Sequence, residues 1–76
     1  MKIYEFQRNA LEKVVIELSD YNSEKYINVR IWFDPGDSSG KYRPSPKGLT
    51  LNVKLIEKLK KGVDMAAAYL EKAKEK

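Results

Sequence analysis

Two stretches of alternating residues, Lys13–Leu18 and Tyr26–Phe33, most constrain what this chain can fold into. Apolar side chains occupy every second position of both, namely Val14, Ile16 and Leu18, then Ile27, Val29, Ile31 and Phe33. Alternation with a period of two is typical of a strand with one apolar face. Residues 20–23, Asp-Tyr-Asn-Ser, supply turn chemistry between the two stretches. The sequence therefore predicts a β-hairpin whose other side is polar, basic and aromatic.

The segments on either side of this hairpin predict a larger sheet. A short pattern over residues 3–8 indicates another strand, and the Pro- and Gly-containing segment 34–40 indicates a loop. Residues 41–52 are predicted to be extended. Pro44 and Pro46 cannot donate ladder hydrogen bonds, so the first part of this segment is expected at an edge or outside the sheet. Leu49 and Leu51 are expected to face the core.

One helix is predicted from Val53 nearly to the end of the chain, with Asn52 as its N-cap. Its apolar stripe consists of Leu55, Ile56, Leu59, Val63, Ala66, Ala67 and Leu70. Gly62 interrupts the helix close to three alanines, and small residues allow another backbone to approach closely. That backbone is either the sheet of the same chain or the helix of a second copy, and we favour the second copy.

Length and composition set further limits. The 76 residues predict a single domain, 1–76, with a thin core of its own. The sequence has no cysteine and no histidine, so disulfides and ordinary zinc sites are excluded, and no cofactor is expected. A homodimer joined through helix and sheet is the favoured source of extra stability, and a well-packed monomer is the alternative. Without a signal peptide or a membrane-length apolar segment, the expected location is cytoplasmic or nucleoid-associated, or nuclear in a eukaryote.

The charge balance favours a polyanionic partner over a catalytic role. Fifteen basic residues against eleven acidic ones give a net charge of +4, which attracts nucleic acids at low salt. The sequence offers no histidine base and no cysteine nucleophile, and its turn serines have no evident activating partner. Asp34 and Asp37 fit turn formation better than a cation loop. The sequence therefore predicts that the protein is not an enzyme.

A mixture of aromatic and basic residues within Tyr26–Leu51 suggests the ligand. Aromatic rings stack on unpaired bases of any kind, and basic side chains neutralise the neighbouring phosphates. Arg30 and Trp32 share one side of a regular strand, while Phe33 takes the stacking role if a bulge breaks the alternation. Arg43 and Lys47 flank Pro-Ser-Pro and are predicted to contact phosphates, with a solvated strand edge as the alternative.

The segments VRIWFDP and KGLTLN, in this order before a helix, resemble the positive-cofactor-four family of transcriptional coactivators. The resemblance spans roughly residues 13–70. It implies a curved four-stranded antiparallel β-sheet followed by one C-terminal α-helix, an α+β fold that dimerises and forms channels for single strands. It also implies that Tyr21 stacks on bases, that Arg30 contacts the nucleic acid and that Lys47 binds a phosphate. Phe33 matches the second stacking position without a gap, and Trp32 matches it with a shorter turn.

The sequence as a whole predicts a homodimer that binds single-stranded DNA with little sequence preference, in transcription regulation or DNA maintenance. RNA is the alternative ligand. The family's hairpin turn is more basic than the one here, where Lys25 is the basic residue left to meet a phosphate. The PUR family of single-stranded DNA- and RNA-binding proteins has the same plan of strands and helix and is the nearest rival. The sequence is also compatible with a module that binds acidic protein partners, such as the transcription machinery, and with a plain structural dimer.

Overall fold

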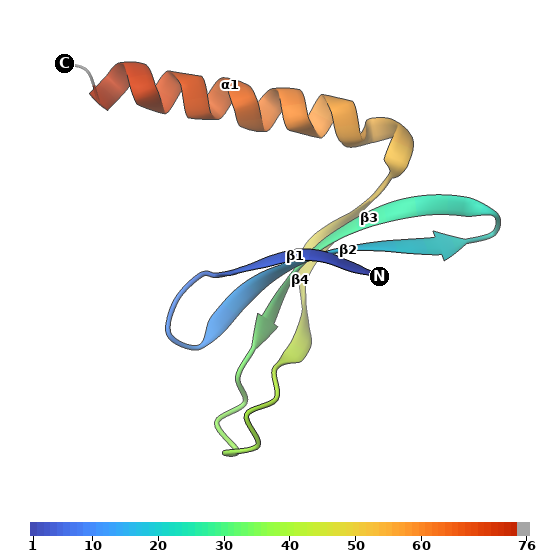
Figure 1. Cartoon of the computed structure of the whole chain (residues 1–76), viewed down its shortest axis with the longest axis vertical. Helices are drawn as coiled ribbons and strands as arrows, with labels where there is room; N and C mark the ends of the chain where they lie inside the picture. The colour runs from blue at the N-terminus through green and yellow to red at the C-terminus, as the bar shows by residue number, and fades with distance from the viewer. Residues whose placement is uncertain (75–76) are drawn as a thin grey trace.

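The computed structural model describes residues 1–74, which form an open antiparallel sheet followed by one helix (Figure 1). The strands are β1 (Lys2–Gln7), β2 (Glu12–Tyr21), β3 (Glu24–Phe33) and β4 (Arg43–Asn52), and their order in the sheet is the order in the chain. A 3-10 turn (Val53–Leu55) leads into α1 (Ile56–Lys74). The predicted α+β fold with four curved strands and one C-terminal helix is confirmed.

The β2–β3 hairpin forms the centre of the sheet. Its pairing is continuous from Glu12 opposite Phe33 to Tyr21 opposite Glu24. Both residues of the connecting turn, Asn22 and Ser23, have left-handed backbones, with φ of 51° and 64°. Two positive φ values in a two-residue turn match the right-handed twist of the flanking strands, which is why such hairpins form. The predicted hairpin and its turn are confirmed.

The register divides the sheet into two faces. The face that we call the polar face carries Lys13, Val15, Glu17, Ser19, Tyr21, Glu24, Tyr26, Asn28, Arg30 and Trp32 of the hairpin. Hydrogen bonds run across it from β2 to β4, because Asn28 donates to Ser19 (2.9 Å) and accepts from Thr50 (2.7 Å). The opposite, apolar face carries Val14, Ile16, Leu18, Ile27, Val29 and Ile31. The predicted polar side of the hairpin is therefore present.

Strand β4 lies at the edge of the sheet, as its prolines predict, and it detours beside Arg30. Gly48 is opposite Arg30 and Pro44 is opposite Trp32. One β3 residue thus faces a three-residue stretch of β4, which is a bulge. Pro46 lies within this stretch and has no N–H to donate, so the detour loses less pairing here than elsewhere in the strand.

Gly48 explains why β4 can pair closely with β3 next to this bulge. A Cβ atom at Gly48 would lie 2.4 Å from the Val29 carbonyl oxygen and 2.8 Å from the Arg30 Cα. Real side-chain carbons do not come this close to other heavy atoms, so only glycine fits without a shift of the strands. The glycine of the KGLTLN segment is therefore a close-approach residue that holds β4 against Arg30.

The helix begins as the sequence predicts but in a different geometry. Asn52 caps it, because its side-chain oxygen accepts from the Lys54 backbone N–H at 2.9 Å. The first turn, predicted to be α-helical from Val53, is a 3-10 turn, and the α-helix starts at Ile56. Tight 3-10 turns are common at helix ends, and periodicity alone does not distinguish them from an α-turn.

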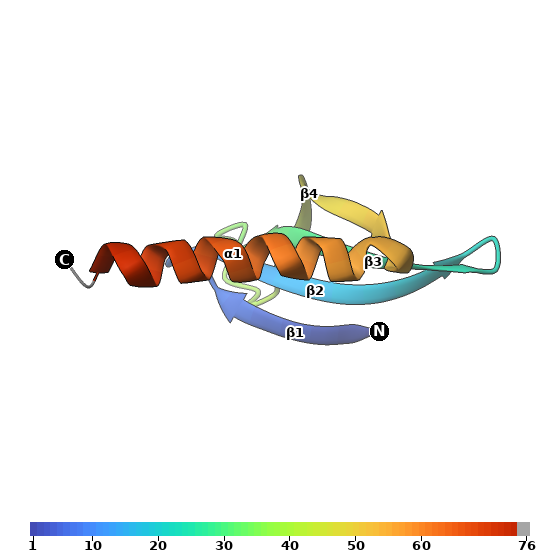
Figure 2. The ribbon, with the colours of Figure 1, turned by 90° about the horizontal axis from the view of Figure 1, so that it is seen from above.

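Beyond this turn, α1 extends back over the sheet as an arm and stands away from the strands (Figures 1 and 2). Ile56 and Leu59 in its first turns are half-buried, but the later apolar side chains are in solvent, with Val63 59% and Leu70 59% exposed. No helix within residues 1–74 is long and apolar enough to cross a membrane.

A single copy of the chain has almost no core. Among the described residues, Val15 is the one buried hydrophobic side chain, at 3% exposure. The side chains of the apolar face are half-buried, and the large apolar residues Tyr4, Phe6 and Leu49 are 61%, 47% and 42% exposed. Leu51 is half-buried, so Leu49 and Leu51, predicted to face a core, face an uncovered surface in one copy.

Candidate nucleic-acid interface

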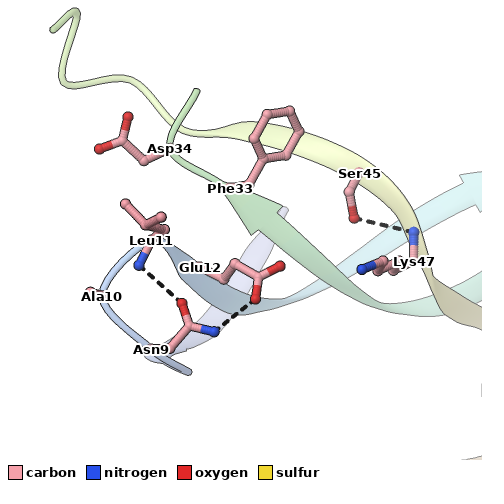
Figure 3. Close-up of a pocket in the computed structure, with 8 residues that line it drawn as sticks. All are labelled: Asn9, Ala10, Leu11, Glu12, Phe33, Asp34, Ser45 and Lys47. Atoms are coloured by element: carbon pink, nitrogen blue, oxygen red, sulfur yellow. Dashed lines mark hydrogen bonds between the residues drawn. The ribbon is translucent and has the colours of Figure 1, made fainter. Parts of the chain in front are cut away.

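Two of the predicted ligand-binding residues, Phe33 and Lys47, line the same open hollow, of about 610 Å³, at the end of the hairpin (Figure 3). The hollow lies where the turn between β1 and β2 meets the last residue of β3 and the bulge of β4. Its lining consists of Asn9, Ala10, Leu11, Glu12, Phe33, Asp34, Ser45 and Lys47. We refer to it below as the Phe33 hollow. A half-buried ring beside an exposed ammonium group is the pairing that a stacked base and its phosphate require.

The structure separates the two aromatic residues between which the sequence could not decide. Trp32 is opposite Lys13 and Phe33 is opposite Glu12, and the pairing of β2 with β3 has no bulge. Neighbouring residues of a regular strand point to opposite faces, so Trp32 lies on the polar face and Phe33 on the other. The bulge that would have exchanged them is present on β4 instead, so it does not move either aromatic residue.

Trp32 lies in a more crowded place than Phe33. It lines a small cavity of about 110 Å³ on the polar face, whose lining also includes Val15 and charged side chains of β1 and β2. Its indole Nε1 is buried and has no hydrogen-bond partner among the described residues. A ring that is surrounded in this way has less surface to offer to a base than one at the wall of an open hollow.

The cavity beside Trp32 is bordered by a paired charge cluster on the polar face. Glu5 accepts from Lys2 at 2.6 Å and from Lys13 at 3.1 Å. These two hydrogen bonds hold the pKa of the Glu5 carboxyl below its usual value, and the bond from Lys2 has the larger effect. The Lys13 ammonium also lies 4.5 Å from the ring centre of Tyr42. Lys13 therefore has partners already and is not a free phosphate contact.

Arg30 occupies the middle of the polar face, half-buried between Val15 on β2 and Gly48 on β4. Its Nη1 donates to the Ser45 carbonyl at 3.0 Å, so it holds the bulge of β4. A guanidinium group has five donors, so this single bond leaves others for a ligand.

Tyr21 and Lys25 lie at the other end of the hairpin. Tyr21 is the last residue of β2 and is 68% exposed, with its position on the polar face set by the register. Lys25 is opposite Asp20, also exposed, and the register places both on the apolar side. The ring of Tyr21 is thus open to a base, while Lys25 reaches a ligand only around the tip of the hairpin.

Arg43 differs from the other predicted phosphate contacts, because it already has an acidic partner. Its Nη2 lies 3.3 Å from Asp37 Oδ2 in the loop between β3 and β4. Hydrogen bonds from Ser39 keep the pKa of Asp37 below its usual value, so this carboxylate stays charged. A phosphate would have to compete with Asp37 for Arg43.

Four polar residues that line the Phe33 hollow were not predicted as site residues from the sequence, namely Asn9, Glu12, Asp34 and Ser45. Asn9 donates to Glu12 Oε1 at 2.8 Å and accepts from the Leu11 backbone N–H at 3.0 Å (Figure 3). For Glu12 the signal was the two-residue turn of the hairpin, which places it opposite Phe33. Among residues 1–74, no three acidic, histidine or cysteine side chains converge where they could hold a metal ion.

The fold places the chain among proteins with an open four-stranded antiparallel sheet that continues into one helix. Aromatic and basic residues lie along the central hairpin of this sheet. The chain belongs to the family of Transcriptional Coactivator p15 (PC4), whose model matches residues 9–62. The resemblance identified from VRIWFDP and KGLTLN is confirmed, and the PUR family is not the one that matches. No curated protein is significantly similar to the chain in sequence.

Solved structures of the same family share the fold. BPSL1147, a PC4 homolog from Burkholderia pseudomallei, superposes with a TM-score of 0.79 at 22% identity, over 88% of this chain and 88% of that one. The bacteriophage T5 homolog of PC4, implicated in recombination-dependent DNA replication, gives 0.59 at 18% identity, over 93% of this chain and 77% of that one. MoSub1 in complex with single-stranded DNA superposes with a TM-score of 0.56 at 24% identity, over 88% of this chain and 75% of that one.

Proposed function

We propose that this protein binds single-stranded DNA as a homodimer, with little overall sequence preference, and that it is a binding protein and not an enzyme. The observation that carries the proposal is the placement of open aromatic rings at both ends of the β2–β3 hairpin. Tyr21 lies at one end, on the polar face together with Arg30. Phe33 lies at the other end, on the opposite face beside Lys47, so a bound strand would pass around the end of the sheet between them. Membership of a coactivator family and the single-stranded DNA in the MoSub1 structure support it.

Of the two neighbouring aromatics, Phe33 is the one that stacks in this proposal. It lines an open hollow together with an exposed lysine, whereas Trp32 lines a small cavity among charged residues. Bases then stack on Tyr21 and Phe33, while phosphates meet Arg30, Lys47 and Lys25. Arg43 contributes less because of its ion pair with Asp37.

The homodimer is proposed from the lack of a core in one copy. The apolar face of the sheet and the apolar stripe of α1 are both uncovered, and the described residues include one buried hydrophobic side chain. A surface of this kind in water is typical of an interface. A second copy offers matching apolar surfaces, since its own helix and sheet are also uncovered. Analytical ultracentrifugation tests this: a monomer at micromolar concentration would contradict it.

The binding experiment is fluorescence anisotropy with a labelled single strand of about 20 nucleotides and the matching duplex, over a salt series. If about four phosphates are neutralised, the logarithm of affinity falls with the logarithm of salt at a slope of about −3. A preference for the single strand with such a slope supports the proposal. Equal and weak binding to both forms would reduce it to charge attraction, and an acidic protein partner would then be tested with acidic peptides.

Paired variants separate stacking from charge. Phe33→Ala is expected to weaken binding by about 1–3 kcal/mol, the usual worth of one stacked base. Trp32→Ala is the matched control, and after correction for any loss of folded protein it should change affinity much less. The reverse order would assign the stacking to Trp32 and the polar face. Repeating the titration with RNA of the same sequence asks whether a 2′-hydroxyl changes the affinity.

The cellular role that goes with this activity is transcription regulation or DNA maintenance. The family description points to transcription and the bacteriophage T5 homolog to recombination-dependent replication. The transcription machinery as a partner and a cytoplasmic, nucleoid-associated or nuclear location are part of the same proposal.

A further inference from the structure

The Phe33 hollow contains a carboxylate where a pure phosphate site would not have one. Glu12 is directly opposite Phe33 in the hairpin, and both line the hollow. Asp34 adds a second carboxylate, against the single ammonium of Lys47. Two carboxylates and one ammonium group line the hollow, and Arg8 pairs with Glu12 from outside it, so the lining itself offers more acceptors than positive charge to a ligand. These acceptors favour a neutral group that carries N–H donors.

The Glu12 carboxylate is held in a defined orientation. Asn9 donates its amide to Glu12 Oε1 at 2.8 Å, and Asn9 is itself fixed by the Leu11 backbone N–H, which donates to its Oδ1 at 3.0 Å. Arg8 Nη1 approaches the same carboxylate oxygen at 3.6 Å. All of these contacts involve Oε1, so Glu12 Oε2 has no protein donor among the described residues. An oriented acceptor with an open second oxygen is ready for a ligand donor.

Guanine is the base whose edge fits such a carboxylate best. Its N1–H and N2–H groups are adjacent and parallel, so they donate to one carboxylate as a pair, as an arginine fork does. Adenine and cytosine offer an amino group beside an acceptor nitrogen, and thymine offers one N–H between two carbonyl oxygens. An acceptor nitrogen or carbonyl beside a carboxylate is repelled. Unpaired bases are commonly read on this edge while an aromatic ring stacks on their face.

We propose that the Phe33 hollow is a guanine-preferring subsite: the base stacks on Phe33, its N1–H and N2–H edge donates to Glu12, and Lys47 meets the adjoining phosphate. A volume of about 610 Å³ is in the range of pockets that enclose small ligands, about 300–1,000 Å³. This inference rests on the proposed single-strand binding and adds a local preference to it. Elsewhere along the strand, stacking on Tyr21 and charge contacts remain indifferent to the base.

The test uses three single strands of about 20 nucleotides in lithium buffer, which prevents guanine quadruplexes. One strand has thymine throughout, one alternates guanine with thymine, and one alternates inosine with thymine. Inosine lacks only the 2-amino group of guanine, so it removes one of the two donors and keeps the stacking surface. The guanine strand is expected to bind about ten- to a hundredfold more tightly than the inosine strand, as a hydrogen bond to a charged acceptor predicts. The thymine strand is expected to bind most weakly.

Variants of the protein locate the preference. Glu12→Gln keeps the shape but removes the charge and one acceptor, so guanine and inosine should become nearly equal while the thymine strand binds at least as well. Glu71→Gln, an exposed carboxylate on α1, is the matched control for a lost negative charge and should keep the discrimination. Asn9→Ala, which frees the orientation of Glu12, should reduce it in part.

The outcomes separate this inference from the function on which it rests. If all three strands bind equally to the unchanged protein, the guanine subsite is wrong and single-strand binding stands. If the preference survives Glu12→Gln unchanged, another residue reads the base and the assignment to Glu12 is wrong. If none of the strands binds, the proposed function itself is wrong.

Discussion

Gly48→Ala tests the close contact between β4 and β3 on which the position of Lys47 depends. The added Cβ would lie 2.4 Å from the Val29 carbonyl oxygen, 2.8 Å from the Arg30 Cα and 3.2 Å from the Arg30 Cβ. Two of these three neighbours are backbone atoms, which cannot rotate away. Side-chain carbons stay at least 3.0 Å from other heavy atoms, so the strands must separate by about 0.6 Å, from 2.4 to 3.0 Å, at this position.

The cost of that separation follows from two contributions. Forcing an extra carbon into a packed site costs about 1–3 kcal/mol, and each ladder hydrogen bond weakened at the separation costs about 1 kcal/mol. We therefore expect the free energy of unfolding to fall by about 2–4 kcal/mol, a large share of the stability of a small domain. Because β4 moves with Lys47, affinity for single strands should fall as well.

Urea denaturation followed by tryptophan fluorescence measures the effect. At a slope of about 1–2 kcal/mol per molar urea, the midpoint should fall by about 1–4 M. All proteins are compared at the same concentration, because the stability of a homodimer depends on it. Lys47→Ala, the exposed neighbour on the same strand, is the control and should change stability by less than about 0.5 kcal/mol. An unchanged midpoint for Gly48→Ala would refute the close-approach argument.

Three smaller perturbations probe the elements around the site. Asn52→Ala removes the cap of the helix and should cost about 1 kcal/mol of stability in the same urea assay, whereas no change would show that the cap is dispensable. Ser23→Gly should add about 0.5–1 kcal/mol, because glycine takes the φ of 64° without strain; a loss would mean that the turn is not left-handed in solution. The Glu5 pKa, lowered by hydrogen bonds from Lys2 and Lys13, should titrate below its usual value by NMR. Since the folded-state pKa is the lower one, this carboxylate stabilises the fold above its unfolded-state pKa, and the contribution disappears as the pH falls through the folded-state value; an ordinary pKa would mean that the two ion pairs do not form in solution.

The strands and the helix were predictable because each depends on neighbours in the sequence. Apolar residues at every second position defined β2 and β3, and the side chain of Asn52 is close enough to the following N–H groups to cap the helix without help from elsewhere. Pro44 and Pro46 predicted an edge strand, because a residue without an N–H cannot contribute to hydrogen bonding with neighbours on both sides of its strand. The 3-10 geometry of residues 53–55 was missed, because α and 3-10 turns place the same few side chains on nearly the same side.

The candidate site was predictable only in part. Residue types and the family resemblance were enough to identify Arg30, Lys47 and the aromatic pair, but they did not show what these side chains contact. The preference for Phe33 over Trp32 needed the folded surroundings of each ring, because the unbroken β2–β3 register leaves the two side chains on opposite faces and does not choose between them. Arg43 looked available in the sequence, and only the folded loop brings Asp37 against it.

The sequence by itself determined the order of strands and helix, the capping residue, the turn and the family, because local periodicity and short-range hydrogen bonding decide these features. The tertiary structure decided which side chains share a face, that Glu12 lies opposite Phe33 with Asn9 holding it, and that Gly48 lies against Arg30. It also showed that one copy leaves its apolar face uncovered. These properties involve residues that are far apart in the chain. They depend on the strand register, because a shift by one residue would move each side chain to the opposite face of the sheet.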